Sequence, residues 1–154
     1  MTSVTAMRTV GELLKSKKPD IQSIGPKASV FDALVRMGEK EIGALMVMDE
    51  KDEVVGIISE RDYARKVSLK GRTSRNAPVE EVMTPVAEMY RVRPETTVEE
   101  CMVLITGKKI RHLPVFDGNK FIGIISIGDV VKSIIAEQES LIEQLSNYIG
   151  GKYV

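Results

Sequence analysis

One segment of the sequence occurs twice, and this internal repeat limits the fold more than any other feature of the chain. The heptapeptide Gly56–Asp62 (GIISERD) returns as Gly123–Asp129 (GIISIGD), about 67 residues later. Self-similarity at a fixed spacing indicates one supersecondary unit used twice. The match extends upstream, where residues pair in the same order: Pro26, Val30, Lys40, Ile42, Leu45, Val47 and Asp49 with Pro94, Val98, Lys108, Ile110, Leu113, Val115 and Asp117.

Each copy is predicted to contain a short amphipathic helix. The apolar residues fall at positions i, i+3, i+4 and i+7, which places them on one face of a helix. We therefore expect each helix to pack that face inward. The residues concerned are Val30, Ala33, Leu34 and Met37 in the first copy and Val98, Cys101, Met102 and Ile105 in the second.

Two apolar runs separated by turn residues follow each helix and predict a β-hairpin. Because these runs are nearly continuous in apolar residues, we expect strands that are covered on both faces. A short strand is also expected before Pro26 and before Pro94, and a second helix is expected to start at Ser59 and at Ser126. The expected strands are 21–24, 44–48, 54–58, 86–92, 113–116 and 121–125.

These elements divide the chain into two β-α-β-β-α repeats and a C-terminal extension. A short helical segment is expected to open each repeat, at 10–14 and 79–83, and Gly150–Gly151 is expected to end the C-terminal helix. The stretch between the repeats is rich in Gly, Ser, Asn and Pro, which is typical of a linker. The expected boundaries are 10–69 for the first repeat, 70–78 for the linker, 79–135 for the second repeat and 136–154 for the C-terminal helix and tail.

The repeated heptapeptide places a serine and an aspartate at the start of a helix. Ser59 and Ser126 lie at the expected N-caps, and Asp62 and Asp129 follow three residues later, as in a capping box. The same geometry suits a ligand, because free N–H groups and the helix dipole attract a phosphate and the serine hydroxyl adds a donor. A carboxylate one turn into the helix can accept hydrogen bonds from two vicinal hydroxyls, so both aspartates are ribose candidates. Two motifs in register favour the ligand, and capping alone is the alternative.

The glycine that begins each heptapeptide lacks a side chain where a strand closes on the next helix. Gly56 and Gly123 therefore permit close approach of a ligand or of another backbone. The sequence leaves both readings open.

The composition narrows the classes of function. With 154 residues, 43% hydrophobic and 29% charged, the chain has enough apolar residues for a compact core. Its 22 basic residues balance 22 acidic ones, so no net field attracts nucleic acid or an anionic membrane. No apolar run reaches the roughly 20 residues that span a bilayer, and the N-terminus lacks the apolar core of a secretory signal, so we expect a cytoplasmic location.

The sequence has no recognisable catalytic or metal-binding motif. It contains no Ser-His-Asp set, no CxxC pair, no P-loop and no HExxH. The single histidine, His112, and the single cysteine, Cys101, make a weak catalytic pair, because Cys101 lies on the apolar stripe of a predicted helix. We expect a binding module rather than an enzyme, with no catalytic residue, no metal and no required cofactor.

Over roughly residues 10–135 the chain resembles the cystathionine-β-synthase (CBS) domain pair. The hallmark of that family is a glycine, two apolar residues, Ser or Thr, two variable residues and Asp, as in both heptapeptides. Segments Ser59–Val67 and Arg111–Val115 look most like small stand-alone CBS-pair proteins. The resemblance implies an α+β fold in which two tandem β-α-β-β-α repeats pack as a pseudo-twofold pair, a Bateman module, here with an extended C-terminal helix.

The resemblance also implies roles for the motif residues. In CBS pairs the motif aspartate typically holds a ribose, which would assign ribose to Asp62 and Asp129. The motif Ser or Thr typically lies near phosphate, which would assign phosphate to Ser59 and Ser126. An adenine typically enters an apolar slot between strands.

Basic residues distinguish the two copies. Arg111 and His112 align with Gly43 and Ala44, so only the second hairpin brings cationic or protonatable side chains to this position. Related CBS pairs place basic residues here against nucleotide phosphates, so both are phosphate candidates. The alternative for His112 is a hydrogen-bonded residue in a half-buried strand. Arg61 is a further phosphate candidate. The alternative is that Arg61 lies on a solvated helix face and pairs with Glu60 or with water.

The resemblance implies a regulatory module that binds an adenine nucleotide and signals to a partner protein by a change of conformation. AMP is the expected ligand, with ADP, ATP or NAD as alternatives. S-adenosylmethionine or a related thioadenosine would use the ribose carboxylate without a phosphate site. The alternative from a different class of function is a ligand-independent structural dimer or adaptor. CBS pairs commonly associate in twos, so we expect a homodimer and an unidentified protein target, but no nucleic acid and no membrane.

Overall fold

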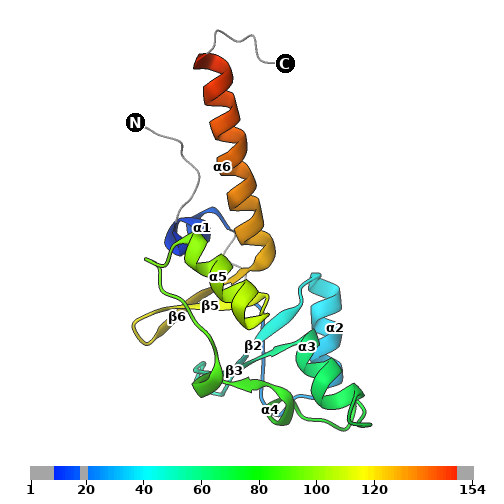
Figure 1. Ribbon diagram of the computed structural model, residues 1–154. Helices are drawn as coiled ribbons and strands as arrows, with labels where there is room; N and C mark the ends of the chain where they lie inside the picture. The colour runs from blue at the N-terminus through cyan, green and yellow to red at the C-terminus, as the bar shows by residue number, and fades with distance from the viewer. Residues whose placement is uncertain (1–8, 18–20, 149–154) are drawn as a thin grey trace. The chain divides into compact units, whose positions relative to one another are not determined.

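The computed structural model describes residues 9–17 and 21–148 (Figure 1). It is a mixed α and β fold, as the repeats predict. Two short non-α helices are present, a π-helix at Ala64–Ser68 and a 3-10 helix at Val86–Glu88. The remaining elements in chain order are α1 (Val10–Ser16), β1 (Ser23–Ile24), α2 (Val30–Lys40), β2 (Ala44–Met48), β3 (Val54–Ser59), α3 (Glu60–Tyr63), α4 (Val79–Val82), β4 (Thr84–Pro85), α5 (Val98–Lys108), β5 (His112–Asp117), β6 (Lys120–Ser126) and α6 (Ile127–Tyr148).

The described residues form two compact units. Residues 21–90 make up the first unit, and residues 9–17 together with 91–148 make up the second unit. The helices that the 3.6-residue spacing predicts are confirmed as α2 and α5, and the two predicted hairpins are confirmed as β2–β3 and β5–β6. Each unit therefore holds one helix and one hairpin of the repeat.

The first unit is built on a sheet whose described strands lie in the order β1-β2-β3-β4. β1 is parallel to β2, whereas the β2–β3 and β3–β4 pairs are antiparallel. Helix α2 begins after Ser29, whose hydroxyl accepts a hydrogen bond of 3.0 Å from the Asp32 N–H. The core joins α2, the sheet and α4 through Val30, Ala33, Met37, Leu45, Val47, Ile58, Val79 and Val82.

The second unit is built on the β5–β6 hairpin. Its register places His112 opposite Ser126 and Val115 opposite Gly123. Helix α5 begins with a capping box in which Thr97 and Glu100 each bond the backbone of the other. The core joins α1, α5, the hairpin and α6 through Val10, Leu13, Cys101, Ile105, Leu113, Val115, Ile125 and Val130.

The prediction that the strands are covered on both faces is confirmed for β2 and β5. Residues Ala44–Val47 and Leu113–Phe116 are all buried. In the partner strands, buried and half-buried residues alternate over Gly56–Ser59 and Gly123–Ser126. The first strand of each hairpin, β2 or β5, is therefore the more deeply buried of the two strands.

The short helices that open the two repeats are exchanged between the units. The Val10 N–H of α1 donates to Thr96 O at 2.8 Å in the second unit, and the Val79 N–H of α4 donates to Ala28 O at 2.8 Å in the first. Each helix thus docks on the repeat from which it does not come in the sequence. The compact units and the sequence repeats divide the chain at different places.

The predicted strand at 86–92 is wrong in its bounds. The chain pairs with β3 at Thr84–Pro85, turns through the 3-10 helix, and then makes an isolated parallel bridge between Val92 and Val115. The segment crosses from the first unit to the second after Tyr90. The segment therefore makes its β pairings in two separate places, one in each unit.

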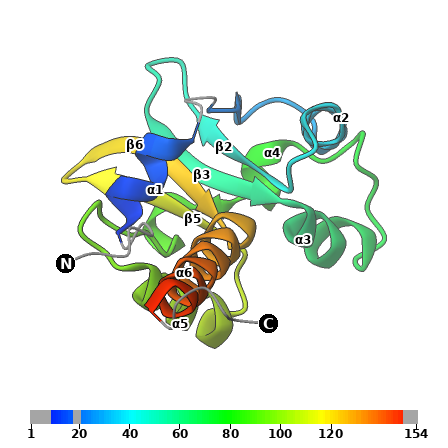
Figure 2. The same ribbon diagram turned by 90° about the horizontal axis from the view of Figure 1, so that it is seen from above.

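Helix α6 confirms the predicted long C-terminal helix. Its first turns pack on the second unit, where Val130 is fully buried. Beyond them the helix runs past α5, as Figures 1 and 2 show. The predicted helix end at Gly150–Gly151 lies outside the described residues. The distal part of α6 exposes apolar side chains: Leu141 by 49%, Ile142 by 49% and Leu145 by 53%.

Candidate functional site

Both heptapeptides run from the end of a strand into the first turn of a helix, and both form the predicted cap. In the first, the Ser59 N–H donates to Asp62 Oδ2 at 3.0 Å and the Asp62 N–H donates back to Ser59 Oγ at 3.3 Å. In the second, the Ser126 N–H donates to Asp129 Oδ2 at 2.8 Å and the Asp129 N–H donates to Ser126 Oγ at 3.2 Å. The serines and aspartates therefore have a structural role in each unit.

The other N–H groups of these first turns are only in part available to an anion. The Glu60 N–H donates to Gly43 O at 3.1 Å, and the Ile127 N–H donates to Arg111 O at 2.8 Å. These two bonds are equivalent in the repeats. In the second motif the Gly128 N–H has no acceptor among residues 9–17 and 21–148. That N–H is the donor left over at the start of α6.

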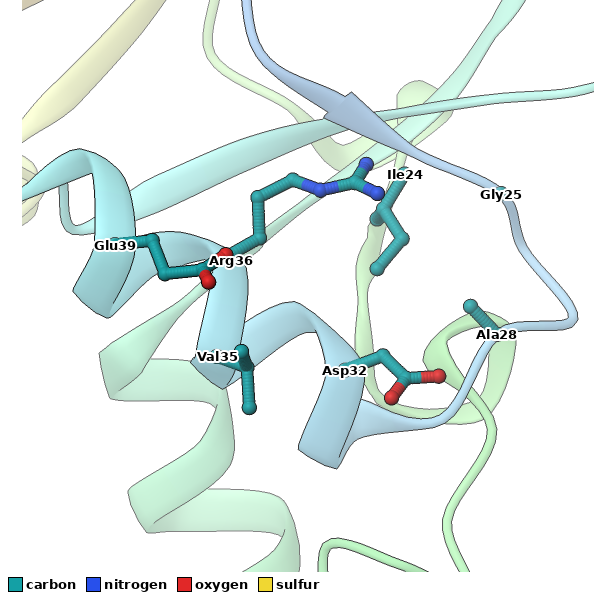
Figure 3. A pocket seen from close by; sticks show the side chains of 7 residues that line it. All are labelled: Ile24, Gly25, Ala28, Asp32, Val35, Arg36 and Glu39. Atoms are coloured by element: carbon teal, nitrogen blue, oxygen red, sulfur yellow. The ribbon is translucent and has the colours of Figure 1, made fainter.

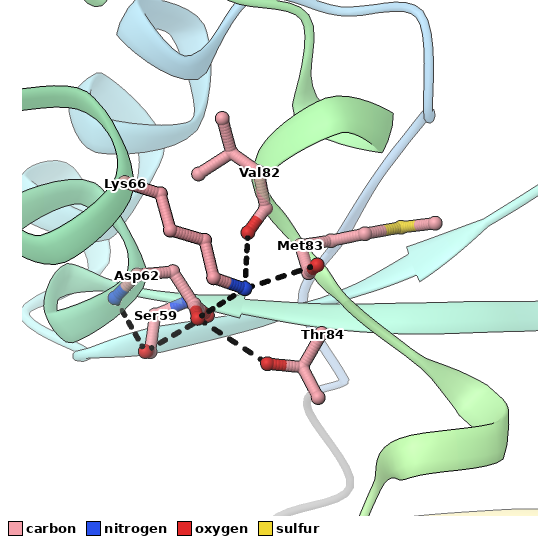
Figure 4. Close-up of polar contacts among 6 residues, drawn as sticks. All are labelled: Ser59, Asp62, Lys66, Val82, Met83 and Thr84. Atoms are coloured by element: carbon pink, nitrogen blue, oxygen red, sulfur yellow. Dashed lines mark hydrogen bonds and ion pairs between the residues drawn. The ribbon is translucent and has the colours of Figure 1, made fainter. Parts of the chain in front are cut away.

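Asp62 uses both of its carboxylate oxygens within the first unit (Figure 4). Oδ2 accepts the cap hydrogen bond, while Oδ1 accepts 3.2 Å from the Thr84 hydroxyl and lies 3.4 Å from Lys66 Nζ. The Lys66 ammonium also donates to the carbonyls of Val82 at 3.1 Å and Met83 at 3.5 Å. The carboxylate thus ties the start of α3 to the end of α4 and to β4.

Asp129 is held differently. Its Oδ2 accepts both the Ser126 N–H and the Lys17 ammonium, the latter at 2.7 Å. Its Oδ1 has no donor in the described part of the chain, and 19% of the side chain is exposed. Burial alone would raise the pKa of this carboxyl, but the hydrogen bonds from Lys17 and from Ser126 hold the pKa below its usual value. Asp129 is therefore a carboxylate at neutral pH with one free acceptor.

Arg111 and His112 lie beside the second motif because β5 pairs with β6. His112 is opposite Ser126 in the register, and its half-buried ring has no hydrogen-bond partner within the described residues. Burial lowers the pKa of His112, and the positive charges of Lys17 and Arg111 lower it further, against the charge of Asp129. The imidazole is thus neutral at pH 7. Arg111 is exposed.

Arg61 lies in the first motif and so belongs to the first unit, whereas Arg111 and His112 belong to the second unit. Its side chain is half-buried and makes no ion pair with Glu60 or with any other described residue. In the first unit, Ala44 takes the place of His112 and is opposite Ser59. The two caps are therefore equivalent, and the copies differ in the charge of the residues beside them, as the sequence predicts.

The two motif glycines make room for protein rather than for open space. A Cβ on Gly56 would lie 2.6 Å from the Thr84 carbonyl oxygen and 2.7 Å from Met83 Sδ. A Cβ on Gly123 would lie 2.8 Å from Leu14 Cδ2. Leu14 and Met83 each lie four residues after the first residue of their helix, α1 or α4. At Gly56 the approaching atom is a backbone oxygen, which is the second of the two readings of the sequence, whereas at Gly123 it is a side-chain carbon.

Lys17, Lys66 and Thr84 contact the motif aspartates, and the sequence analysis missed all three. Lys17 and Asp129 are separated by 112 residues, and Thr84 and Asp62 by 22. Lys66 had a usable signal, because it lies four residues after Asp62 on the same helical segment. The other two depend on the exchange of the leading segments, for which the sequence has no local signal.

A separate hollow of about 360 Å³ lies in the first unit between α2 and the segment after β1 (Figure 3). None of the motif residues lines it. The Arg36 guanidinium at its edge donates to the Ser23 carbonyl oxygen. The lining residues are Ile24, Gly25, Ala28, Asp32, Val35, Arg36 and Glu39.

Three further properties of the described residues concern metal binding, the cysteine and the membrane. In residues 9–17 and 21–148, no group of three His, Cys, Asp or Glu side chains is arranged to hold a metal ion. Burial raises the pKa of the Cys101 thiol to about 11, so this cysteine is protonated and not nucleophilic at neutral pH. No described helix is both long enough and apolar enough to cross a bilayer.

Known proteins resemble this chain over most of its length. The family model for the CBS domain matches residues 10–69 and 79–136. A CBS domain-containing protein of Arabidopsis thaliana, CBSX3, named as mitochondrial, is 36% identical over 94% of this chain and 73% of its own length. A solved structure of a protein with CBS domains from Burkholderia ambifaria is 49% identical, with a TM-score of 0.78 over 84% of this chain and 96% of that one.

A further solved structure contains a ligand. It is that of CBSX2 in complex with AMP, which is 30% identical to this chain, with a TM-score of 0.65. The similarity covers 82% of this chain and 96% of CBSX2.

Proposed function

The chain belongs to the CBS-domain family, and from this premise we propose that it is a regulatory module that binds an adenine nucleotide, with AMP as the first candidate. One observation carries the proposal. In the second unit the free carboxylate oxygen of Asp129 lies at the same helix start as the basic residues Arg111 and His112. A carboxylate oxygen that can accept a hydrogen bond from a ribose hydroxyl, next to basic side chains that attract a phosphate, suits a ribose that carries a phosphate.

The ribose is assigned to Asp129. Oδ2 is already used by the cap and by Lys17, so a ribose hydroxyl can donate to Oδ1 without breaking either contact. The pKa of Asp129 lies below its usual value, so the carboxylate accepts hydrogen bonds at any physiological pH. A hydrogen bond to a charged acceptor is among the stronger ones in proteins.

The phosphate is assigned to the groups around the N-terminus of α6. Arg111 offers a guanidinium, neutral His112 offers a ring N–H, and the Ser126 hydroxyl and the Gly128 N–H lie at the helix start. The dipole of this 22-residue helix adds partial positive charge at that end. Together these groups favour an anionic ligand over a neutral one.

The first motif is the weaker candidate. Both oxygens of Asp62 have partners, and the positions of Arg111 and His112 are taken by Gly43 and Ala44. A ribose at Asp62 would have to displace Thr84 or Lys66. Ser59 and Arg61 keep their assignment as phosphate candidates for this motif, but we expect the second motif to dominate binding.

The comparisons support an adenine nucleotide without fixing which one. CBSX2 is similar over most of both chains and has AMP bound in its structure. ADP, ATP and NAD contain the same adenosine monophosphate moiety and are the alternatives. S-adenosylmethionine shares the ribose but replaces the phosphate with a sulfonium cation, which the charges of Lys17 and Arg111 disfavour.

Isothermal titration calorimetry tests the proposal. Protein that has been unfolded and refolded, to remove carried-over ligand, is titrated separately with AMP, ATP, NAD and S-adenosylmethionine. Micromolar binding of a phosphate-bearing ligand, with weaker or absent binding of S-adenosylmethionine, is the expected result. No heat with any of the four would contradict the proposal and favour the adaptor reading.

The signal would be read by another protein. We propose that ligand binding changes a conformation that a protein target recognises. A ligand can shift such an equilibrium only by its difference in affinity for the two conformations.

Self-association is a second candidate function, and one observation favours it. Leu141, Ile142 and Leu145 are each about half exposed on α6 and are spaced at i, i+1 and i+4, on one face of the helix. Apolar clusters of this kind are uncommon on the surface of monomers. We propose that this face is covered by a second copy of the chain.

Multi-angle light scattering checks the association. The protein is expected to have twice the mass of the 154-residue chain at micromolar concentration. The double variant Leu141→Ser, Leu145→Ser should shift it towards the monomer, because both changes remove apolar area from the exposed face. A monomeric mass for the unmodified protein would count against the homodimer.

A further inference from the structure

Lys17 occupies an unusual place in the second unit. It is the C-cap residue of α1, and its ammonium reaches Asp129 Oδ2 at 2.7 Å and the Ile124 carbonyl at 3.0 Å. One third of the side chain, 33%, is exposed. The docking of α1 on β6, with Leu14 over Gly123, fixes where this side chain starts. The ammonium therefore lies at the carboxylate that we assign to ribose.

In the first unit the motif aspartate is contacted by a neutral hydroxyl, from Thr84, and by Lys66, which follows it on the same helical segment. There Ile57, the counterpart of Ile124, is paired with Thr84 of β4, and the Thr84 hydroxyl donates to Asp62 at 3.2 Å. The second unit has no described strand at this edge of β6, and Lys17 supplies the donors instead.

The two lysines on the motif aspartates also differ in how fully they are used. An ammonium has three donors. Lys66 finds three acceptors in Asp62, Val82 and Met83. Lys17 finds two, and its third donor has no acceptor in the described part of the chain. Lys17 thus keeps a hydrogen-bond donor for a ligand, and Lys66 does not.

The charge around Lys17 is favourable for an anion. Arg111 and Lys17 both contact the first turn of α6, since the Arg111 carbonyl oxygen accepts from the Ile127 N–H at 2.8 Å and the Lys17 ammonium donates to Asp129 at 2.7 Å. Both positive charges act on the ring of His112, and Asp129 contributes one negative charge against them. The second motif is thus positive overall at neutral pH. A dianionic phosphate that entered it would meet two cations, each on a side chain with solvent access.

We propose that Lys17 is a ligand-contact residue, which donates a hydrogen bond to the phosphate of the bound nucleotide and selects phosphate-bearing ligands over uncharged adenosine. The inference rests on the proposed function and names a residue outside the repeated motif. While its ammonium holds Asp129 in place for the ribose, its remaining donor binds the phosphate. The same cation disfavours ligands with positive charge at that position.

Titration of Lys17→Met with AMP and with adenosine tests this. Methionine keeps the length of the side chain and removes its charge. AMP is expected to bind about 10- to 100-fold more weakly, which corresponds to the loss of one hydrogen bond to a charged group. Adenosine, titrated at millimolar concentration, should change by less than about 3-fold. Lys17→Arg should keep most of the affinity for AMP.

Lys15→Met is the matched control. Lys15 lies on the same helix, is exposed, and loses the same charge. Its AMP affinity is expected to match that of the unmodified protein. Should Lys17→Met fail to fold, as judged by circular dichroism, Lys17→Gln takes its place.

Three results would overturn the inference. Unchanged AMP affinity in Lys17→Met would exclude the contact. Equal weakening of AMP and adenosine would mean that Lys17 only positions Asp129. Unmodified protein that binds neither ligand would overturn the proposed function itself, a result that can be told apart from the other two because it appears before any substitution is made.

Discussion

Asp129→Ala is expected to weaken AMP binding by about 1–3 kcal/mol, the range for loss of a hydrogen bond to a charged, partly buried acceptor. Oδ1 of Asp129, which has no donor among the described residues, is the proposed acceptor for the ribose, and Asp129 is the acidic residue of the first turn of α6. Calorimetric titration of the variant and of the unmodified protein measures the change directly. The variant also removes the partner of Lys17, which then lacks the contact that holds it near the site.

Asp62→Ala is the matched control for this change. Both variants lose the aspartate of an equivalent cap, so both should lose about 1 kcal/mol of helix stabilisation. Only Asp129→Ala should also lose most of the affinity for AMP, because both oxygens of Asp62 are already used by Ser59, Thr84 and Lys66. Unchanged affinity in both variants would eliminate the ribose assignment. A larger loss in Asp62→Ala would move the main site to the first motif.

Gly56→Ala is expected to lower the free energy of unfolding by about 3 kcal/mol, at the upper end of the usual cost of overpacking. The new Cβ would lie 2.6 Å from the Thr84 carbonyl oxygen, an atom of the backbone that cannot rotate away. β4 would have to separate from β3, where Gly56 is opposite Pro85. Urea denaturation followed by circular dichroism gives the change.

Gly123→Ala provides the comparison within the same chain. Its Cβ would be too close only to the Cδ2 atom of Leu14, at 2.8 Å, and the other near atoms also belong to that side chain. A leucine side chain can change its rotamer at a cost of about 1 kcal/mol. We therefore expect a much smaller loss than for Gly56→Ala. Equal losses in the two variants would show that the identity of the contacting atom does not set the cost.

Local patterns predicted the elements of each repeat well. The apolar spacing of Val30 to Met37 and of Val98 to Ile105 located α2 and α5, and the turn residues located both hairpins. The Ser-Asp spacing predicted the two caps, which form within four consecutive residues. All of these features depend on residues that are neighbours in the sequence, so a periodic pattern is enough to identify them.

Contacts between distant segments could not be predicted in this way. The apolar stripe of α1 fits either hairpin, because both hairpins present a glycine and apolar residues at the docking place. The sequence therefore does not say which repeat α1 joins. The short strand predicted at 86–92 is wrong because its two ends belong to different units, which the local residue pattern does not indicate.

The sequence by itself determined the family, the two repeats, the capped motifs and the difference in charge between them, because each of these is written in residue types at short or regular spacing. The tertiary structure decided which oxygens of Asp62 and Asp129 are free, since that depends on where Thr84 and Lys17 arrive after the leading helices have been exchanged. Docking of α1 and α4 is a matter of packing over a distance in sequence. It gives two equivalent motifs different surroundings, and these surroundings are the basis on which we propose the second motif as the ligand site.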